Sequence, residues 1–362
     1  MSPSLQPPLQ PLPLGTRVAR FCTGCGISRL LSRWRPAEAC VLTFHGLRAE
    51  ESRVPEMLDQ DQHVPVSVFG EVCEHLARHY RVVHARDVAA AQAGGPKLPP
   101  RAVAITFDDG YESNYALAYP VLKRLGLPAT IFLTTGYLDR SVLPWFVRLE
   151  MALSRTTQPR LQIEDFTVLL SNEAERREAY MALCGRLKSR TQAEADALLI
   201  AIEDALQVHL QAGDPLPAPL RPMTWDMARE MHASGLITLG GHTHTHPILG
   251  RCTPERAEHE IRTCHARIRD EIGTPPSLFA YPNGGPGDFD HDTQATLAST
   301  GFSGSFTMNA GFIHPHHEVL ALPRYGNPSE PWEVEAMASG LMERLRQFRR
   351  GLGLRWKKEV AA

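Results

Sequence analysis

The sequence lacks the segments that mark an exported or membrane-spanning protein. Its first residues, MSPSLQPPLQPLPLG, carry no positive charge, and prolines interrupt their apolar residues, which argues against a signal peptide and against a spanning helix. No later run reaches the roughly 18 apolar residues that a membrane span needs. We therefore expect a cytoplasmic protein.

The sequence also has little net charge and no regular cysteine framework. Its formal charge is −2 over 362 residues, so nucleic acid is not an expected partner. Seven scattered cysteines do not form the pattern of a secreted disulfide scaffold and favour a reducing compartment. Cys22-x-x-Cys25 has no second ligand pair nearby; it could be redox-active or bind metal, but a free pair is the simpler interpretation.

Apolar runs of strand length alternate with helical patterns along most of the chain. Strands are expected at residues 40–44, 80–83, 102–107, 129–133, 236–240, 278–281, 304–306 and 319–322. Helices are expected at residues 66–78, 115–125, 224–233, 254–272 and 292–299. This alternation, with short connections, predicts a mainly parallel sheet with helices outside it.

Three segments depart from this alternation. Residues 1–36 are Pro-rich and then basic, so we expect a flexible arm. Residues 37–340 form the main domain, in which residues 139–222 contain little strand pattern but a long, charged helical region at 172–210. We interpret residues 139–222 as a helical insertion, and residues 341–362 as a basic tail.

The two ends of the chain are rich in basic residues. Seven lysines and arginines lie within residues 344–358, close to Leu352, Leu354 and Trp356. The segment is interpreted either as a solvated helix end or as a peripheral contact with an anionic membrane, to which the basic residues of 16–35 would add.

Two adjacent carboxylates follow the expected strand in VAITFDDGYESN, residues 103–114. Asp108 and Asp109 come directly after the apolar run, and Gly110 follows them. In a parallel α/β barrel, the C-terminal ends of the strands hold the active site, because the loops there converge. Asp-Asp-Gly also suits a plain turn, so this segment alone leaves both interpretations open.

Three histidines follow another expected strand in LITLGGHTHTHPIL, residues 236–249. The spacing of His242 and His246 lets both imidazoles approach one ion, whereas His244 is expected to point away. Two histidines and one carboxylate leave open positions for water and substrate, which is typical of a catalytic metal site. Zn²⁺ fits this set best, and Co²⁺, Mn²⁺, Ni²⁺ and Fe²⁺ are compatible with it.

The motifs TFDDGY, HTxTHP and FAYPNG resemble those of the polysaccharide deacetylase superfamily, also called NodB-homology or carbohydrate esterase family four. The resemblance covers about residues 38–330, interrupted by the insertion. It implies an α/β fold, a distorted (β/α)7-type barrel. It further implies that Asp108 is the general base, and that the metal is held by Asp109, His242 and His246.

Two family motifs are altered in this chain. The family's groove motif is commonly Arg-x-Pro-Tyr, but residues 280–283 read AYPN, so Tyr281 and Asn283 stand there and the backbone N–H of Asn283 would be the oxyanion donor. The missing arginine must come from elsewhere. ALPRYGNP resembles exopolysaccharide-type members and offers Arg324, which we expect to pair with Asp108; the alternative is a surface arginine.

The family's late Leu-x-His motif is not evident, and HPHH at residues 314–317 follows no apolar strand. VLTFHGL, residues 41–47, instead brings His45 to a strand end, as in permuted members that act on poly-N-acetylglucosamine. His45 is our candidate to protonate the leaving amine; the alternative is a structural histidine. Five aromatic residues could stack on sugar or lie in the core: Tyr111, Trp145, Phe146, Trp225 and Trp332.

These observations predict a metal-dependent hydrolase that removes an N-acetyl group, or less readily an O-acetyl group, from a glycan or a lipid-linked amino sugar. A carbohydrate or glycolipid is the expected substrate. Two alternatives stay open. One is a small-molecule amide hydrolase or deformylase on the same barrel, and the other is a catalytically silent module that binds glycan.

Overall fold

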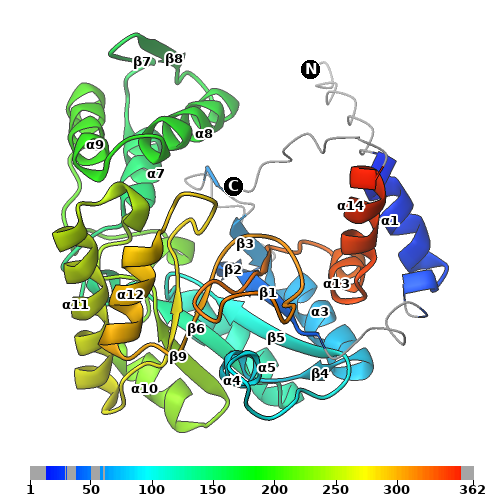
Figure 1. Ribbon diagram of the computed structural model, residues 1–362. Coiled ribbons are helices and arrows are strands. Elements are labelled where there is room, and N and C mark those ends of the chain that lie inside the picture. The colour runs from blue at the N-terminus through cyan, green and yellow to red at the C-terminus, as the bar shows by residue number, and fades with distance from the viewer. Residues whose placement is uncertain (1–13, 29, 31–37, 50–57, 60–61, 352–362) are drawn as a thin grey trace.

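A curved parallel sheet lies at the centre of the molecule, with helices around it (Figure 1). The computed structural model describes residues 14–28, 30, 38–49, 58–59 and 62–351. Seven strands follow one another in the order β11-β10-β9-β6-β5-β1-β12, and β4 pairs with β5 beside this path. All of these pairings are parallel. The predicted fold class, a distorted (β/α) barrel, is confirmed.

The barrel strands are short and buried on both faces. Their bounds are β1 (Cys40–Phe44), β4 (Arg81–Val82), β5 (Ala102–Phe107), β6 (Ala129–Leu133), β9 (Ile237–Gly241), β10 (Leu278–Ala280), β11 (Gly304–Phe306) and β12 (Tyr325–Gly326). Every residue of β1, β5, β6 and β9 is buried. Burial on two faces explains why these strands are continuous apolar runs rather than alternating ones.

The two edges of the sheet are joined by residues 319–326. The backbone N–H of Leu322 donates to the carbonyl of Ser305 in β11 at 2.9 Å. A few residues later, Tyr325 of β12 pairs with Leu42 of β1. The first and last strands are therefore neighbours, and side chains from both ends of the domain reach one mouth of the barrel.

The strand predicted at residues 319–322 is wrong, because these residues form no strand in the structure. Leu322 makes only an isolated bridge with Phe306. Pro323 follows at once, and since proline has no N–H it cannot continue a ladder of hydrogen bonds. The paired residues instead resume at β12, after this interruption.

Helices cover the outside of the sheet: α3 (Val66–His79), α4 (Ala85–Gln92), α5 (Tyr119–Leu125), α10 (Trp225–Ala233), α11 (Pro254–Ile272) and α12 (His291–Thr300). The longest, α11, has the predicted ends. The Thr253 side chain accepts from the N–H of Arg256, Pro254 takes the first turn, and the helix stops at Gly273 with φ 79°. The helix predicted at 115–125 begins with a π-helical turn, η2 (Asn114–Ala118), before α5.

The predicted insertion stands above one side of the barrel, at the upper left of Figure 1. It contains α7 (Trp145–Arg155), β7 (Arg160–Ile163), β8 (Phe166–Leu169), α8 (Glu173–Lys188) and α9 (Gln192–Leu206). The antiparallel hairpin β7–β8 was not predicted. Buried aliphatic side chains from α7, α8 and α9 form a separate core, including Leu149, Leu153, Leu183, Leu199 and Ile202. The insertion is thus a packed unit.

Segments from the two ends of the chain pack together, at the right of Figure 1. They are α1 (Leu14–Gly24), α13 (Pro331–Ala338) and α14 (Leu341–Gly351). Ala19 of α1 is fully buried in a cluster with Ala336 and Leu341. The flexible arm expected over residues 1–36 is therefore wrong for residues 14–24, because a small residue lets α1 pack closely on α13 and α14. Within that arm, residues 1–13, 29 and 31–36 lie outside the described residues.

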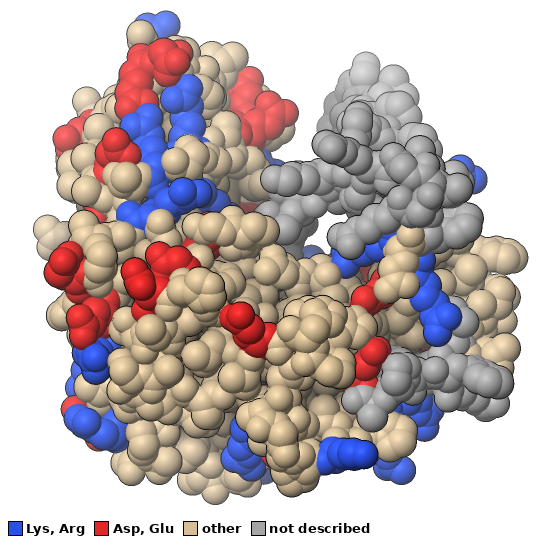
Figure 2. All heavy atoms as spheres, viewed as in Figure 1, with Lys and Arg blue, Asp and Glu red and all other residues tan. Residues whose placement is uncertain are grey.

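Charges of both signs are mixed over the visible face of the molecule, the insertion included (Figure 2). Among the described residues, no helix combines the length and the apolar character that crossing a bilayer would require. All seven cysteines are free, Cys22 and Cys25 among them.

Candidate active site

The Asp-Asp pair lies at the C-terminal end of β5. Asp108 donates its backbone N–H to the carbonyl of Phe44 in β1 at 3.0 Å, which ties the turn to the neighbouring strand. Asp109 has φ 72° and Gly110 has φ 83°. Both carboxylates are almost completely buried, 2% and 3% exposed. The turn is therefore a rigid part of the barrel mouth and not a solvated surface turn.

The histidine loop lies at the C-terminal end of β9, two strands away. The side-chain hydroxyl of Thr243 accepts the N–H of His246 at 3.0 Å, which folds the loop back on itself. The Nδ1 atom of His242 lies 2.8 Å from the carbonyl oxygen of Ala280. Because a carbonyl can only accept, Nδ1 carries the proton and Nε2 is left with its lone pair.

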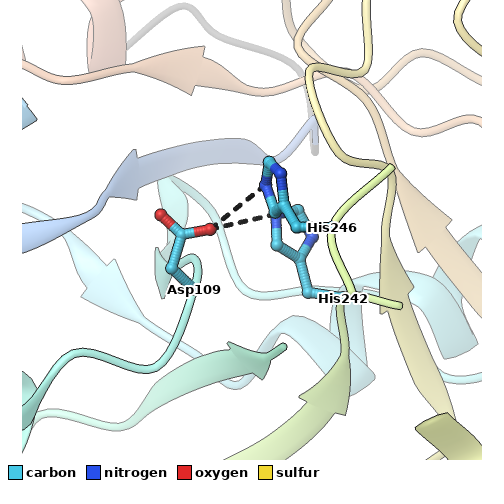
Figure 3. A group of neighbouring side chains, drawn as sticks. All are labelled: Asp109, His242 and His246. Carbon is cyan, nitrogen blue, oxygen red and sulfur yellow. Dashed lines mark ion pairs between the residues drawn. The ribbon is translucent and has the colours of Figure 1, made fainter. Parts of the chain in front are cut away.

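Asp109, His242 and His246 converge on one point (Figure 3). The Oδ1 atom of Asp109 lies 3.5 Å from Nε2 of His242 and 3.3 Å from Nε2 of His246. One ligand atom from each residue lies within 4.8 Å of the others. The chain thus brings together the three residues that the sequence predicted as a triad. His244 lies outside this group, with Nδ1 2.9 Å from the hydroxyl of Thr135.

The charge of this group suits a divalent cation. Burial opposes ionisation of Asp109, but the neighbouring imidazole of His246 outweighs it, and the pKa of Asp109 lies below its ordinary value. Burial lowers the pKa of His242 to about 4, so this imidazole is neutral near pH 7. Oδ1 of Asp109 is buried without a hydrogen-bond partner in the described part of the chain. One carboxylate oxygen that accepts no hydrogen bond, facing one nitrogen from each of two imidazoles, is a set of ligand atoms that fits a metal.

Arg324 forms a buried pair with Asp108. Nη1 and Nη2 donate to the two carboxylate oxygens, each at 2.8 Å, and Arg324 is 0% exposed. Nε also donates to the carbonyl of Thr307 at 3.2 Å. Burial would raise the pKa of Asp108, but the guanidinium lowers it below its usual value. The pairing predicted from the sequence is confirmed, and the surface alternative for Arg324 is excluded.

His45 follows β1 and is oriented by a residue that the sequence analysis missed. Its Nδ1 atom lies 3.0 Å from Oδ1 of Asn327, whose amide nitrogen donates to Gln62 at 2.5 Å. Since an amide oxygen only accepts, Nδ1 of His45 carries a proton, and Nε2 is the atom left for other partners. The carbonyl of His45 accepts from Asn114 at 2.7 Å.

His63, in β3 (His63–Pro65), was also missed. It is 2% exposed, and burial lowers its pKa to about 3. Its ring lies against Gly46 of β2 (Gly46–Arg48), where a Cβ atom would come within 1.9 Å of Nδ1. Only glycine fits there. No local pattern points to His63, since its position depends on the pairing of β2 with β3.

Tyr281 and Asn283 follow β10 and line the same pocket. The Tyr281 hydroxyl donates to the carbonyl of Leu320 at 2.8 Å, and its ring stacks on Phe289 with centroids 4.1 Å apart. Asn283 has φ 61°. Its backbone N–H has no hydrogen-bond partner among the residues that the structure describes. That N–H is therefore available to a ligand, whereas the Tyr281 hydroxyl already serves the fold.

Backbone strain is concentrated at this site. Nine non-glycine residues have a positive φ in the described chain. Five of them lie here: Asp109, Thr243, His246, Asn283 and Asn327. A left-handed conformation is uncommon for residues other than glycine; Asp, Asn and His tolerate it best, and a β-branched residue such as Thr243 least. Strain of this kind persists where the surrounding structure imposes a functional geometry.

One pocket of ≈ 120 Å³ is lined by Asp108, by the triad, and by His45, His63, Tyr281 and Asn283. Arg324 does not line it and lies behind Asp108. Barrel residues on its wall include His45, His63, Asp108, Asp109, Tyr111, His242, His246, Tyr281 and Asn283. The insertion adds Trp145, Phe146, Glu150, Tyr180, Met181, Cys184 and Lys188. Of the five aromatic candidates, Tyr111, Trp145 and Phe146 line the pocket. Trp225 and Trp332 lie elsewhere, bonded through their indole N–H groups to Asp139 and Glu330.

Comparisons with known proteins agree with this architecture. The IcaB structure from Ammonifex degensii superposes with a TM-score of 0.55 at 20% identity, covering 84% of this chain and 98% of that one. The Streptococcus pyogenes deacetylase PplD gives a TM-score of 0.55 at 15% identity, covering 84% and 99%. At these identities the likeness shows a shared fold.

Sequence relatives match over shorter stretches. A Bacillus subtilis relative, YxkH, is 32% identical over 100 residues, 27% of this chain and 33% of that protein. The poly-beta-1,6-N-acetyl-D-glucosamine N-deacetylase of Staphylococcus aureus is 51% identical over 41 residues, 11% of this chain and 14% of that protein. The chain thus matches a third or less of the length of these relatives. The polysaccharide deacetylase family model matches residues 95–305, more than half of the chain. This chain belongs to the polysaccharide deacetylase family of hydrolases.

Proposed function

We propose that this protein removes the N-acetyl group of an amino sugar, in a glycan or a lipid-linked saccharide, with the help of a divalent cation. One observation carries the proposal: a three-ligand group and a separate ionised carboxylate, Asp108, share one pocket. A purely structural metal site would have a closed set of ligands and would need no carboxylate beside it. Relatives named as poly-beta-1,6-N-acetyl-D-glucosamine N-deacetylases support the same reaction class.

Asp109, His242 and His246 are the residues that would hold the cation. When bound, the cation supplies Lewis acidity, which polarises the acyl oxygen and makes a water molecule more acidic. Two imidazoles and one carboxylate suit Zn²⁺, and Co²⁺, Mn²⁺, Ni²⁺ and Fe²⁺ accept the same ligands.

Asp108 is the proposed base. Its carboxylate is kept ionised by Arg324, and each oxygen keeps a second lone pair that can accept a proton from the attacking water. The Arg324 guanidinium also fixes the plane of the carboxylate, so the accepting oxygen does not rotate away. The price is a weaker base, because the pKa of Asp108 is lowered.

His45 is the proposed acid. Asn327 accepts the hydrogen bond of Nδ1–H, so the departing amine would take its proton from Nε2. This step requires the doubly protonated imidazolium form of His45, which becomes the neutral imidazole when the proton leaves. The backbone N–H of Asn283 is the proposed donor to the acyl oxygen as negative charge develops there. Both groups line the same pocket as Asp108.

Metal analysis combined with acetate release tests the proposal. Purified wild-type protein should contain about one divalent cation per chain, and His242→Ala should lose it, because a ligand is removed. Asp108→Asn should keep the metal and lose turnover by about 10²- to 10⁴-fold, since only the base is changed. Acetate is measured on a panel of N-acetylated sugars.

His244→Ala is the matched control. It changes a histidine of the same loop that lies outside the triad, so its metal content should equal that of the wild type. Equal loss of metal in His244→Ala and His242→Ala would contradict the assignment. Binding of glycan without any acetate release would favour the silent module, and release of formate from a small formamide, with no acetate released, would favour the deformylase.

A further inference from the structure

The insertion builds a wall of the active-site pocket from α7 and α8. The ring of Phe146 meets the ring of His246 edge-on, with centroids 4.9 Å apart, so this wall begins directly beside the triad. Trp145 packs edge-on against Phe146 at 5.8 Å. Both residues belong to a helix that is anchored in the insertion's own core, so the wall is a rigid part of the pocket.

Most of this wall is apolar. Trp145, Phe146, Tyr180, Met181 and Cys184 line it, and Ile248 of the barrel adjoins it. Met181 keeps 39% of its surface exposed, although burial of a methionine side chain is favourable. An exposed apolar side chain is unremarkable by itself, but here it lies on the wall of a pocket beside aromatic rings. Such a wall suits an apolar group of a ligand better than a hydrated sugar chain.

Besides its apolar residues the wall carries Glu150, whose carboxylate accepts from the N–H groups of Leu58 and Asp59, and Lys188. Lys188 ends α8, lines the pocket, and has no hydrogen-bond or ion-pair partner in the part of the chain that the structure describes. Its neighbours Arg186 and Arg190 do pair with acids, at 3.1 and 2.5 Å. The end of α8 explains why a cation is tolerated there, because of the helix dipole. The helix dipole does not explain why the ammonium group of Lys188 lines a pocket without an acidic partner.

The pocket continues past Lys188. A smaller cavity shares Trp145, Lys188 and Ile248 with the main pocket. A ligand that extends from the main pocket into the smaller cavity would therefore lie beside the ammonium group of Lys188. Lysine is a common point-charge partner for phosphate.

We propose that the insertion wall binds the non-sugar side of the substrate, a phosphate group joined to an apolar chain. Lys188 contacts the phosphate, and the apolar chain lies along Met181 and the aromatic side chains. The substrate class is thus a phosphate-linked glycolipid that carries an N-acetylated amino sugar. This inference rests on the proposed function, because it concerns the same pocket.

Three matched substrates test it: N-acetylglucosamine 1-(octyl phosphate), octyl N-acetylglucosaminide and methyl N-acetylglucosaminide. We expect kcat/KM for acetate release to fall in that order. Lys188→Gln should lower kcat/KM about tenfold more for the phosphate substrate than for the other two, as a charge-assisted contact is lost. Met181→Asp should lower kcat/KM more for both octyl substrates than for the methyl glycoside. Lys97→Gln and Ile200→Asp are the controls, since both residues are exposed and line neither cavity.

Binding of octyl phosphate, measured by calorimetry, tests the wall without turnover. Wild-type protein should bind it, and Lys188→Gln should bind it about tenfold more weakly. If octyl phosphate binds in this way but no sugar is deacetylated, the proposed function fails and the inference about the wall stands. Equal kcat/KM for the three substrates, equal loss on all of them in Lys188→Gln, or no binding of octyl phosphate would overturn the inference.

Discussion

Arg324 and Asp108 are two buried charges that depend on each other. Each would be costly to bury alone, and the pair is acceptable because both carboxylate oxygens meet a guanidinium N–H. The arginine also lies 5.4 Å from the ring centroid of Phe132, which limits the room for water beside it. A change of either residue therefore affects stability as well as chemistry.

Arg324→Met should lower the free energy of unfolding by about 3–5 kcal/mol, because it leaves the carboxylate of Asp108 buried and unpaired. Adding Asp108→Asn should restore much of the loss, since the uncompensated charge is then gone. Arg229→Met is the control: its ion pairs with Asp226 and Glu271 are exposed, so about 0–1 kcal/mol is expected. Thermal unfolding of the four proteins measures these differences, and no recovery in the double variant would contradict the argument.

At the scale of elements, α7 ties the insertion to the barrel through Glu150. Its carboxylate accepts the N–H of Leu58 at 2.6 Å and that of Asp59 at 3.2 Å. Burial raises the pKa of Glu150 to about 7. The two hydrogen bonds lower this pKa, but by less than burial raises it. Because the folded pKa lies above the unfolded value, the stability that Glu150 contributes is present below the unfolded pKa. It is lost as pH rises through the folded pKa.

The wild type should therefore lose stability relative to Glu150→Gln between about pH 4.5 and pH 7. The difference is about 3 kcal/mol, since one pH unit is worth about 1.36 kcal/mol. Glutamine keeps an oxygen that can accept from the two N–H groups but does not titrate. Melting temperatures of both proteins at several pH values check this, and parallel curves would contradict it.

At the scale of the whole molecule, the described helices near the two ends of the chain, α1 and α14, lie on one side of the barrel. Residues 14–35 contain five arginines and no acidic residue, and α1 packs beside α13 and α14. On α1, Phe21 is 71% exposed and Val18 is 38% exposed. Exposed apolar side chains among arginines are typical of a peripheral contact with anionic lipid. The membrane contact expected from the sequence stays a prediction, now with named residues.

Phe21→Asp and Arg17→Gln should each weaken binding to vesicles that contain anionic lipid. About 1 kcal/mol is expected for the arginine, because that is the attraction of one basic residue to such a surface. Leu169→Asp is the control, an exposed apolar residue of the insertion, 56% exposed. Co-sedimentation measures binding; equal binding to zwitterionic vesicles, or equal loss in Leu169→Asp, would argue against this surface.

Much of the barrel could be predicted because its signals are local. The bounds of β1, β5, β6, β11 and α11 agree with the sequence to the residue, since apolar runs and helix caps are read within a few positions. The hairpin β7–β8 and helices α1, α7 and α13 were missed, as their form depends on packing that short patterns do not reveal. Residues 319–322 were misassigned because they carry a strand composition next to a proline.

The sequence by itself determined the chemistry at the strand ends: Asp108 and Asp109 after one strand, His242 and His246 after another, each within a recognisable motif. Only the tertiary structure decided their partners. Arg324 meets Asp108 across 216 positions, and His45 meets Asn327 across 282. Such contacts arise when closure of the barrel brings β12 beside β1, and when the insertion packs over the mouth. They depend on the path of the whole chain, which no local pattern records.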